Sequence, residues 1–77
     1  MNVKQAREYF EMGVIAGFEV LRSPMSNDWL LQIVGRAGKS WFLQTALKQD
    51  KAYSSLDTLI SEIEGITGRV SGFTVRL

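Results

Sequence analysis

The feature that most restricts the fold is a pair of strand-like segments, residues 29–34 and 40–47, separated only by the five residues GRAGK. Both segments are rich in aromatic and aliphatic residues, and the loop between them contains two glycines. A loop this short joins neighbouring antiparallel strands. A third such segment, residues 14–22, comes first and is followed by the turn-forming residues SPMSND. The sequence therefore predicts an antiparallel meander of three strands.

A short helix is expected before the meander. Asn2 followed by Gln5 three residues later is a capping-box pattern, which marks the start of a helix. Apolar residues recur at helical spacing after it, and Gly13 is a natural stop. We expect a helix over residues 3–12.

A second helix and a last strand are expected after the meander. Ser54 with Asp57 three residues later is again a capping-box pattern, placed before leucines and isoleucines at helical spacing. Either Gly65 or Gly68 ends this helix. Residues 69–77 then predict a fourth strand, parallel to the third because a helix connects them, and paired with either the third strand or the first.

These elements define an α+β fold in the order αβββαβ, with residues 1–77 as a single domain and both helices packed on one face of the sheet. The chain has 77 residues and neither cysteine nor histidine. Disulfides and the two commonest zinc ligands are therefore excluded, and stability must come from packing. A chain this short buries only about 60% of its unfolded surface, so every apolar element has to contribute.

Strand alternation sorts the meander into two faces. The residues expected in the core, under the helices, are Val14, Ala16, Phe18, Val20, Trp29, Leu31, Ile33, Trp41, Leu43, Thr45 and Leu47. Those expected on the other face are Ile15, Glu19, Leu21, Leu30, Gln32, Val34, Phe42, Gln44 and Ala46. A helix-free face this apolar is typical of a surface that meets another subunit, a nucleic acid or a peptide.

The GRAGKS stretch resembles the end of a nucleotide-binding P-loop but lacks its spacing. The P-loop has its first glycine five positions before Gly38, where this chain has Ile33. The loop must also open a helix, whereas WFLQTAL after it has strand character. We interpret the stretch as a hairpin loop and expect no nucleotide binding.

Catalytic chemistry finds little support in the sequence. The chain has no histidine to activate a serine, and no serine lies in a G-x-S-x-G pattern. Asp57, Glu62 and Glu64 lack the spacing of a metal loop, and a solvated helix face is the simpler interpretation. We expect a protein that is not an enzyme and uses neither a metal nor a cofactor.

Charge and hydropathy indicate the class of environment. The net charge is only +1, which predicts no strong non-specific attraction to nucleic acid. No apolar run approaches the roughly 20 residues that span a bilayer, and the first residues lack the pattern of a secretory signal. We expect a cytoplasmic protein without a membrane partner.

The placement of cations suggests a first functional hypothesis. Arg36 and Lys39 lie in the second hairpin loop, Lys48 follows the third strand, and Phe42 lies on the helix-free face. Together they are typical of an aromatic platform rimmed by cations, with Trp29 or Trp41 near its edges, that binds single- or double-stranded nucleic acid. The competing interpretation is that the tryptophans belong to the core and the loop cations only solubilise the chain.

The second hypothesis assigns the helix-free face to protein contacts. Leu30, Val34 and Phe42 would form the interface of a homodimer or of an adaptor that binds another protein. The same residues are consistent with both hypotheses, and the sequence leaves the two open.

From Trp29 onward the chain resembles small accessory proteins carried on bacterial plasmids, some of them partition-associated. The resemblance rests on WLLQIVGR, GKSWFLQT, SLDTLISEI at residues 55–63 and FTV near the end. It implies a role in plasmid maintenance or DNA-associated regulation, without catalytic residues, and it transfers no site residue. The resulting expectation is a small non-catalytic accessory protein associated with nucleic acid, or alternatively a protein–protein adaptor.

Overall fold

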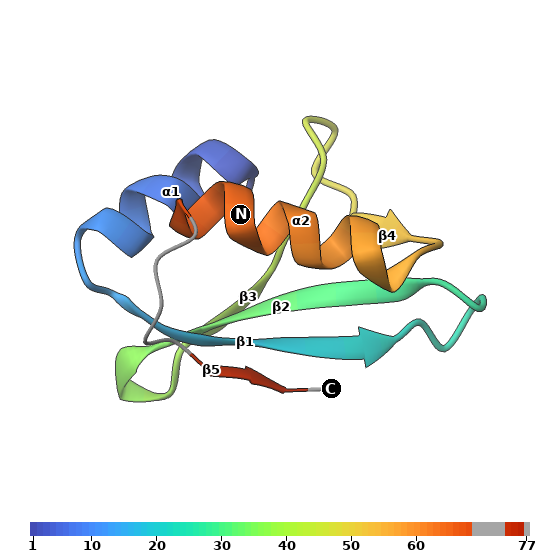
Figure 1. Ribbon diagram of the computed structural model, residues 1–77, viewed down its shortest axis with the longest axis horizontal. Helices are drawn as coiled ribbons and strands as arrows, with labels where there is room; N and C mark the ends of the chain where they lie inside the picture. Colours follow the sequence, from blue (N-terminus) through green and yellow to red (C-terminus); the bar gives the residue numbers. More distant parts are fainter. Residues whose placement is uncertain (69–73, 77) are drawn as a thin grey trace.

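The computed structural model describes residues 1–68 and 74–76. In chain order the elements are α1 (Val3–Glu11), β1 (Ile15–Arg22), β2 (Trp29–Gly35), the short 3-10 helix η1 (Arg36–Gly38), β3 (Ser40–Phe42), β4 (Ala52–Tyr53), α2 (Leu56–Thr67) and β5 (Thr74–Arg76). Both helices cover the same face of the sheet (Figure 1). The α+β class and the placement of the two helices are therefore confirmed.

The sheet has the strand order β3-β2-β1-β5, and β4 also pairs with β2. The β1–β2 and β2–β3 pairs are antiparallel, which confirms the predicted meander. Strand β5 runs parallel to β1 and pairs with it. Of the two partners that the sequence left open, the first and the third strand, the last strand therefore pairs with the first strand. The short strand β4 was not predicted.

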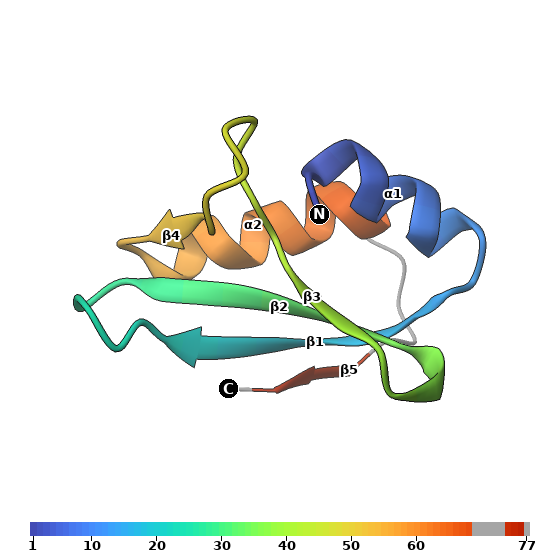
Figure 2. The ribbon, with the colours of Figure 1, turned by 180° about the vertical axis from the view of Figure 1, so that it is seen from behind.

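The third strand is shorter than expected because β4 occupies its place. It ends at Phe42, whereas the sequence predicted a strand over residues 40–47. Trp29 and Leu30, at the start of β2, pair with Tyr53 and Ala52 of β4 and not with a longer β3. The chain between β3 and β4 forms an arm that projects past the helices (Figure 2). Leu47 in this arm is 81% exposed, so its assignment to the core was wrong.

A β-bulge near the start of β1 changes which residues enter the core. Ile15 pairs with Gly35, and Gly17 with Val34, so Ala16 is an extra residue on β1. The extra residue turns Ile15 toward the helices, where it is buried, and leaves Ala16 exposed. The predicted assignments of these two residues were therefore reversed.

The first helix begins as its sequence predicts. The Asn2 side chain accepts a hydrogen bond from the Gln5 backbone N–H at 2.8 Å, and the Gln5 side chain accepts one from the Asn2 N–H at 3.0 Å. This reciprocal capping box satisfies two of the free donors at the helix start. The helix ends at Glu11, and Gly13 follows with φ of 74°.

The second helix differs from the prediction at its start and agrees with it at its end. Its N-cap is Ser55 and not Ser54, and the Ser55 side chain makes no capping hydrogen bond, so the expected capping box is absent. Asp57 still lies in the first turn, where a carboxylate is favourable to the helix dipole. The helix continues through Gly65 and ends at Thr67, and Gly68 is its C-cap, with a φ of 68° that suits glycine.

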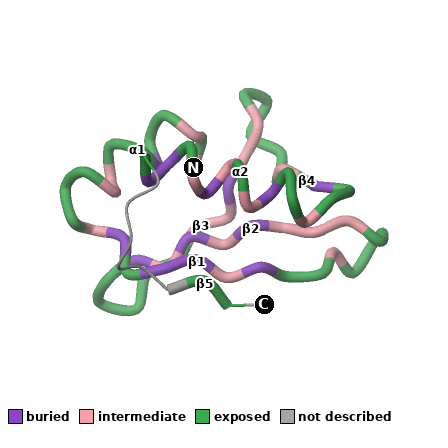
Figure 3. The backbone as a smooth tube through the Cα atoms, viewed as in Figure 1, coloured by how far each residue is buried: buried purple, intermediate pink, exposed green. Residues whose placement is uncertain are grey.

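The core lies between the helices and the sheet (Figure 3). Its buried apolar residues are Ala6, Ile15, Phe18, Val20, Leu31, Ile33, Leu43, Tyr53, Leu59, Ile63 and Ile66. Helix α2 packs against α1, β2 and β4 and so closes this layer. Trp29 and Trp41 are partly buried against the cluster. Among the described residues, no helix lies over the opposite side of the sheet (Figure 1).

Candidate functional site

The side of the sheet that faces away from the helices is the candidate binding surface, and we call it the open face. Its residues alternate with Phe18, Val20, Leu31 and Ile33, which are buried against the helices. The open face consists of Gly17, Glu19, Leu21, Leu30, Gln32, Val34, Ser40, Phe42 and Arg76.

One row of cross-strand neighbours crosses the whole sheet. Arg76 pairs with Glu19, Glu19 with Gln32, and Gln32 with Phe42. We call these four residues the central row. It places a guanidinium group on the β5 edge and an aromatic ring on the β3 edge, with a carboxylate and an amide between them.

Apolar side chains lie on either side of the central row. Leu30 pairs with Leu21 on β1 and with Ala52 on β4, and Val34 lies opposite Gly17 on the other side of the row. Leu21 is 36% exposed, while Leu30, Val34 and Phe42 are half-buried. The open face is thus mixed, as the sequence predicted, with apolar side chains that no helix covers.

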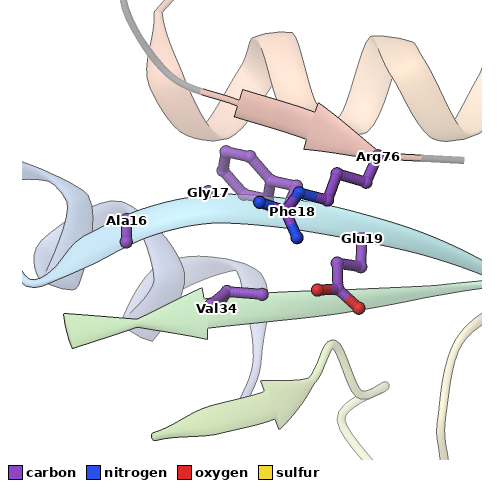
Figure 4. Close-up of a pocket in the computed structure, with 6 residues that line it drawn as sticks. All are labelled: Ala16, Gly17, Phe18, Glu19, Val34 and Arg76. Atoms are coloured by element: carbon purple, nitrogen blue, oxygen red, sulfur yellow. The ribbon is translucent and has the colours of Figure 1, made fainter. Parts of the chain in front are cut away.

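A hollow of about 150 Å³ lies on the open face over the bulged part of β1. It is lined by Ala16, Gly17, Phe18, Glu19, Val34 and Arg76 (Figure 4). Gly17 has no side chain to fill this space, and Figure 4 shows the Arg76 side chain reaching from β5 across β1. The β-bulge and one glycine therefore create the hollow, which alternation alone does not predict.

Two opposite charges border the hollow without being paired. Within residues 1–68 and 74–76, neither the Glu19 carboxylate nor the Arg76 guanidinium forms a hydrogen bond or an ion pair. In Figure 4 the Glu19 carboxylate lies over β2 and the Arg76 guanidinium lies over β1. Neither charged group thus has a side-chain partner among the described residues, and together the two leave the central row without net charge.

Two of the expected nucleic-acid contacts share the loop between β2 and β3. Arg36 and Lys39 are exposed there. The Arg36 Nε donates to the Gly13 carbonyl oxygen at 2.8 Å, and its backbone N–H donates to the Val14 carbonyl oxygen at 3.0 Å. Arg36 thus also holds the connection between α1 and β1. Phe42 follows on β3, within the open face.

The structure does not bring the fourth expected contact to this site. Lys48 lies in the arm between β3 and β4, which projects on the helix side, far from the loop of Arg36 and Lys39 in both Figure 1 and Figure 2. Its φ of 62° and the hydrogen bond from its N–H to the Thr45 carbonyl oxygen belong to the turn of that arm. The four predicted residues therefore do not form one surface.

Both tryptophans lie on the helix side and not on the open face. Trp41 meets Tyr9 edge-on, with ring centroids 5.4 Å apart. The Arg22 guanidinium lies 4.1 Å from the centre of the Trp29 ring. Among the described residues Phe42 is then the single aromatic side chain on the open face, and the predicted platform is reduced to one ring.

A polar cluster between β4 and α2 was missed by the sequence analysis, which treated Glu62 as part of a solvated helix face. Glu62 Oε1 accepts a hydrogen bond from Lys51 Nζ at 2.5 Å and another from the Tyr53 hydroxyl at 2.9 Å. The three residues meet only through the folded connection between β4 and α2, so no local spacing reveals them.

The environment of this cluster shifts two pKa values. Burial alone raises the pKa of Glu62, but hydrogen bonds from Lys51 and Tyr53, with the charges of Lys51 and Arg7, outweigh burial and lower it below 4.5. Burial, followed by the hydrogen bond to Glu62 and its charge, raises the pKa of the Tyr53 phenol. Each group is held in the protonation state that keeps the cluster bonded.

Other chemical sites are not found in the part of the chain that the structure describes. No group of three acidic residues there is close enough to hold a metal ion. No helix among those residues has the length and apolar character needed to cross a bilayer. The open face, with its hollow, is the surface on which we base the functional assignment.

Comparisons of the chain with protein-family models, with curated proteins and with solved structures gave no significant match. The resemblance to plasmid accessory proteins therefore stays a prediction, and the functional assignment depends on the geometry of the open face.

Proposed function

We propose that this chain is a small non-catalytic binding protein that contacts a protein partner through the open face. The observation that carries the proposal is the composition of that face. Its apolar side chains are partly exposed and no helix among the described residues covers them, and its one carboxylate and one guanidinium have no side-chain partner among those residues. Exposed apolar surface with a few charges is typical of protein contacts.

The charge distribution favours a protein over a nucleic acid as this partner. Glu19 lies near the middle of the open face, where it would repel a phosphate backbone. Phe42 offers one stacking ring, whereas platforms that bind single strands use successive aromatic side chains. Arg36 already has a backbone partner in Gly13.

Nucleic acid is the second candidate, supported by the charge of one segment. Residues 29–49 contain no aspartate or glutamate, but they carry Arg36, Lys39 and Lys48. In this alternative Arg36 and Lys39 contact phosphates and Phe42 stacks on a base at the neighbouring edge. The setting would be the cytoplasm and the maintenance of a plasmid or another mobile element, as the resemblance implies.

Photo-crosslinking tests the proposal directly. A benzoyl-phenylalanine in place of Leu30 reports contacts at the open face, and one in place of Ser61 on the exposed side of α2 is the control. After irradiation in cell extract, we expect protease-sensitive adducts from position 30 and few from position 61. Nuclease-sensitive adducts from position 30 would favour the second candidate, and no adduct from that position would reject the open face.

Fluorescence anisotropy with labelled single- and double-stranded oligonucleotides tests the second candidate. If Arg36 and Lys39 contact phosphates, replacing both by alanine reduces the steepness of the plot of log affinity against log salt concentration by about two. The Lys48→Ala variant is the control, because Lys48 belongs to the arm between β3 and β4, which projects on the helix side of the sheet. Absence of binding at low salt would reject this candidate.

A further inference from the structure

We infer that the partner at the open face is a second copy of this chain, with Phe42 of each copy seated in the hollow of the other. This inference rests on the proposed role of the open face and names its occupant. It follows from the central row, which has the Phe42 ring at one edge of the sheet and, at the other edge, Arg76, which lines the hollow.

The strand order makes the two features meet in a symmetric dimer. Two sheets that pack face to face around a two-fold axis parallel to their strands, running between β1 and β2, place β3 of one copy over β5 of the other. Phe42 and Arg76 are the ends of the same row, so this axis brings Phe42 over the partner's Arg76. The same contact forms twice in each dimer.

The hollow fits an aromatic ring in size and in chemistry. Its volume is about 150 Å³, and an apolar protein cavity of about 150 Å³ holds a benzene molecule. Val34 supplies an apolar wall, and Arg76 brings a guanidinium group over the space. A guanidinium within about 6 Å of an aromatic ring is attracted to its face.

The remaining charges of the central row also suit a second copy. In this arrangement Gln32 lies over the partner's Glu19. The Gln32 amide uses one hydrogen for Ser40 Oγ at 3.0 Å, and its second hydrogen is free to be donated to the carboxylate. Because each copy contributes one positive and one negative group to the row, two such faces do not repel each other.

A contact at the β3 edge explains why face-to-face packing is preferred to strand addition there. The Met1 ammonium group donates to the Phe42 carbonyl oxygen at 3.3 Å, and the Gln44 N–H donates to the Met1 carbonyl oxygen at 2.7 Å. These are outward-pointing backbone groups that an added strand would need. The edge is partly occupied, whereas the face beside it is open.

Sedimentation equilibrium with point variants tests the inference. We expect the natural sequence to dimerise, and Phe42→Ala to raise the dissociation constant about 100-fold, from about tenfold for each of the two rings. Arg76→Ala, at an exposed edge, is expected to raise it about fivefold or more. Leu47→Ala is the matched control, because it removes an equally apolar side chain, 81% exposed, from the opposite side.

Mixing two variants tests the reciprocal fit. Phe42→Ala keeps the hollow and loses the ring, whereas Val34→Phe keeps the ring and fills the hollow. Each alone is expected to dimerise weakly, and the mixture to form a heterodimer with one occupied hollow, detected by native mass spectrometry. Thermal unfolding of both variants verifies that they are folded. A mixture that associates no better than the variants alone would overturn the inference.

The outcomes separate this inference from the proposed function. A natural sequence that remains monomeric at about 100 μM, far above the range of specific complexes, overturns the dimer. If position 30 still crosslinks to a different protein, the open face keeps its proposed role. If it crosslinks to nothing, both proposals fail. A dimer that survives Phe42→Ala and Arg76→Ala unchanged overturns the inference alone.

Discussion

The two faces of this sheet are built from alternate residues of the same strands, yet the side chains of one face are buried much more fully than those of the other. Toward the helices, Phe18, Leu31 and Ile33 are at most 1% exposed. On the open face, the neighbours Glu19, Leu30 and Val34 are only half-buried, and polar and apolar side chains are mixed. The comparison shows that the helices of the chain bury one face of the sheet, while the other face keeps exposed surface that a partner can cover.

Two adjacent leucines of β2 provide the strongest test of this comparison. Leu31→Ala should lower the free energy of unfolding by about 2–5 kcal/mol, because it leaves a cavity in a tightly packed layer. Leu30→Ala should cost below about 1.5 kcal/mol, because its side chain is only partly buried. Denaturant unfolding of both variants measures the difference. Equal losses would mean that the open face is packed as fully as the core.

Glycine substitutions sharpen the comparison at the helix side. A Cβ at Gly35 would lie 2.7 Å from Trp41 Cζ3, so Gly35→Ala should cost about 1–3 kcal/mol by displacing the ring. The nearest atom to a Cβ at Gly65, on α2, is Arg7 Nη2 at 3.9 Å. Gly65→Ala should therefore stabilise the helix by about 0.5–1 kcal/mol. Denaturant titration of both variants measures the change in the free energy of unfolding, which should be negative for Gly35→Ala and positive for Gly65→Ala.

The starts of the two covering helices differ in how they are capped. Asn2→Ala removes a side chain that caps α1 and should cost about 1 kcal/mol. Ser55→Ala should have a smaller effect, because the Ser55 hydroxyl makes no capping hydrogen bond. Thermal unfolding compares the two. A larger loss from Ser55 would show that its hydroxyl has a role in solution that the geometry lacks.

The cluster of Lys51, Tyr53 and Glu62 predicts the smallest effect, a dependence of stability on pH. The folded pKa of Glu62 is lowered, so its contribution is present above its unfolded value of 4.5 and is lost as pH falls through the folded value. The folded pKa of Tyr53 is raised, so its contribution is lost as pH rises above 10.0.

Unfolding curves of variants check both limbs of this profile. Glu62→Gln should remove the acid-side loss that Glu62 causes, and Tyr53→Phe should remove the alkaline-side loss. Asp57→Asn is the control, because this carboxylate is exposed on the same helix. If Glu62→Gln loses stability at low pH as much as the natural sequence does, Glu62 is not the source of that loss.

The elements that the sequence predicted correctly depend on neighbours in the chain. The capping box of Asn2 and Gln5, the glycine stop at Gly13 and the meander from β1 to β3 all follow local patterns. The candidate site was predicted only in part: Leu30, Val34 and Phe42 do lie on the open face, as alternation requires. Their role in binding stays a prediction.

What failed to be predicted depends on residues that are distant in the sequence. Strand β4, at residues 52–53, lies beside Leu30 in the place expected for a longer third strand, and no local propensity predicts this pairing. The cluster at Glu62 joins residues 11 positions apart across a turn, and Arg76 reaches the hollow from the other end of the chain.

The sequence alone thus determined the class of fold, the first helix and the alternation of β2, because hydrogen bonding within a helix and the pleat of a strand are set by nearby residues. Tertiary structure alone decided the bulge at Ala16, the extra strand β4, the partner of β5 and the hollow over Gly17. Register and strand pairing are chosen by competition between distant segments for the same backbone groups, and this competition is resolved only when the chain packs.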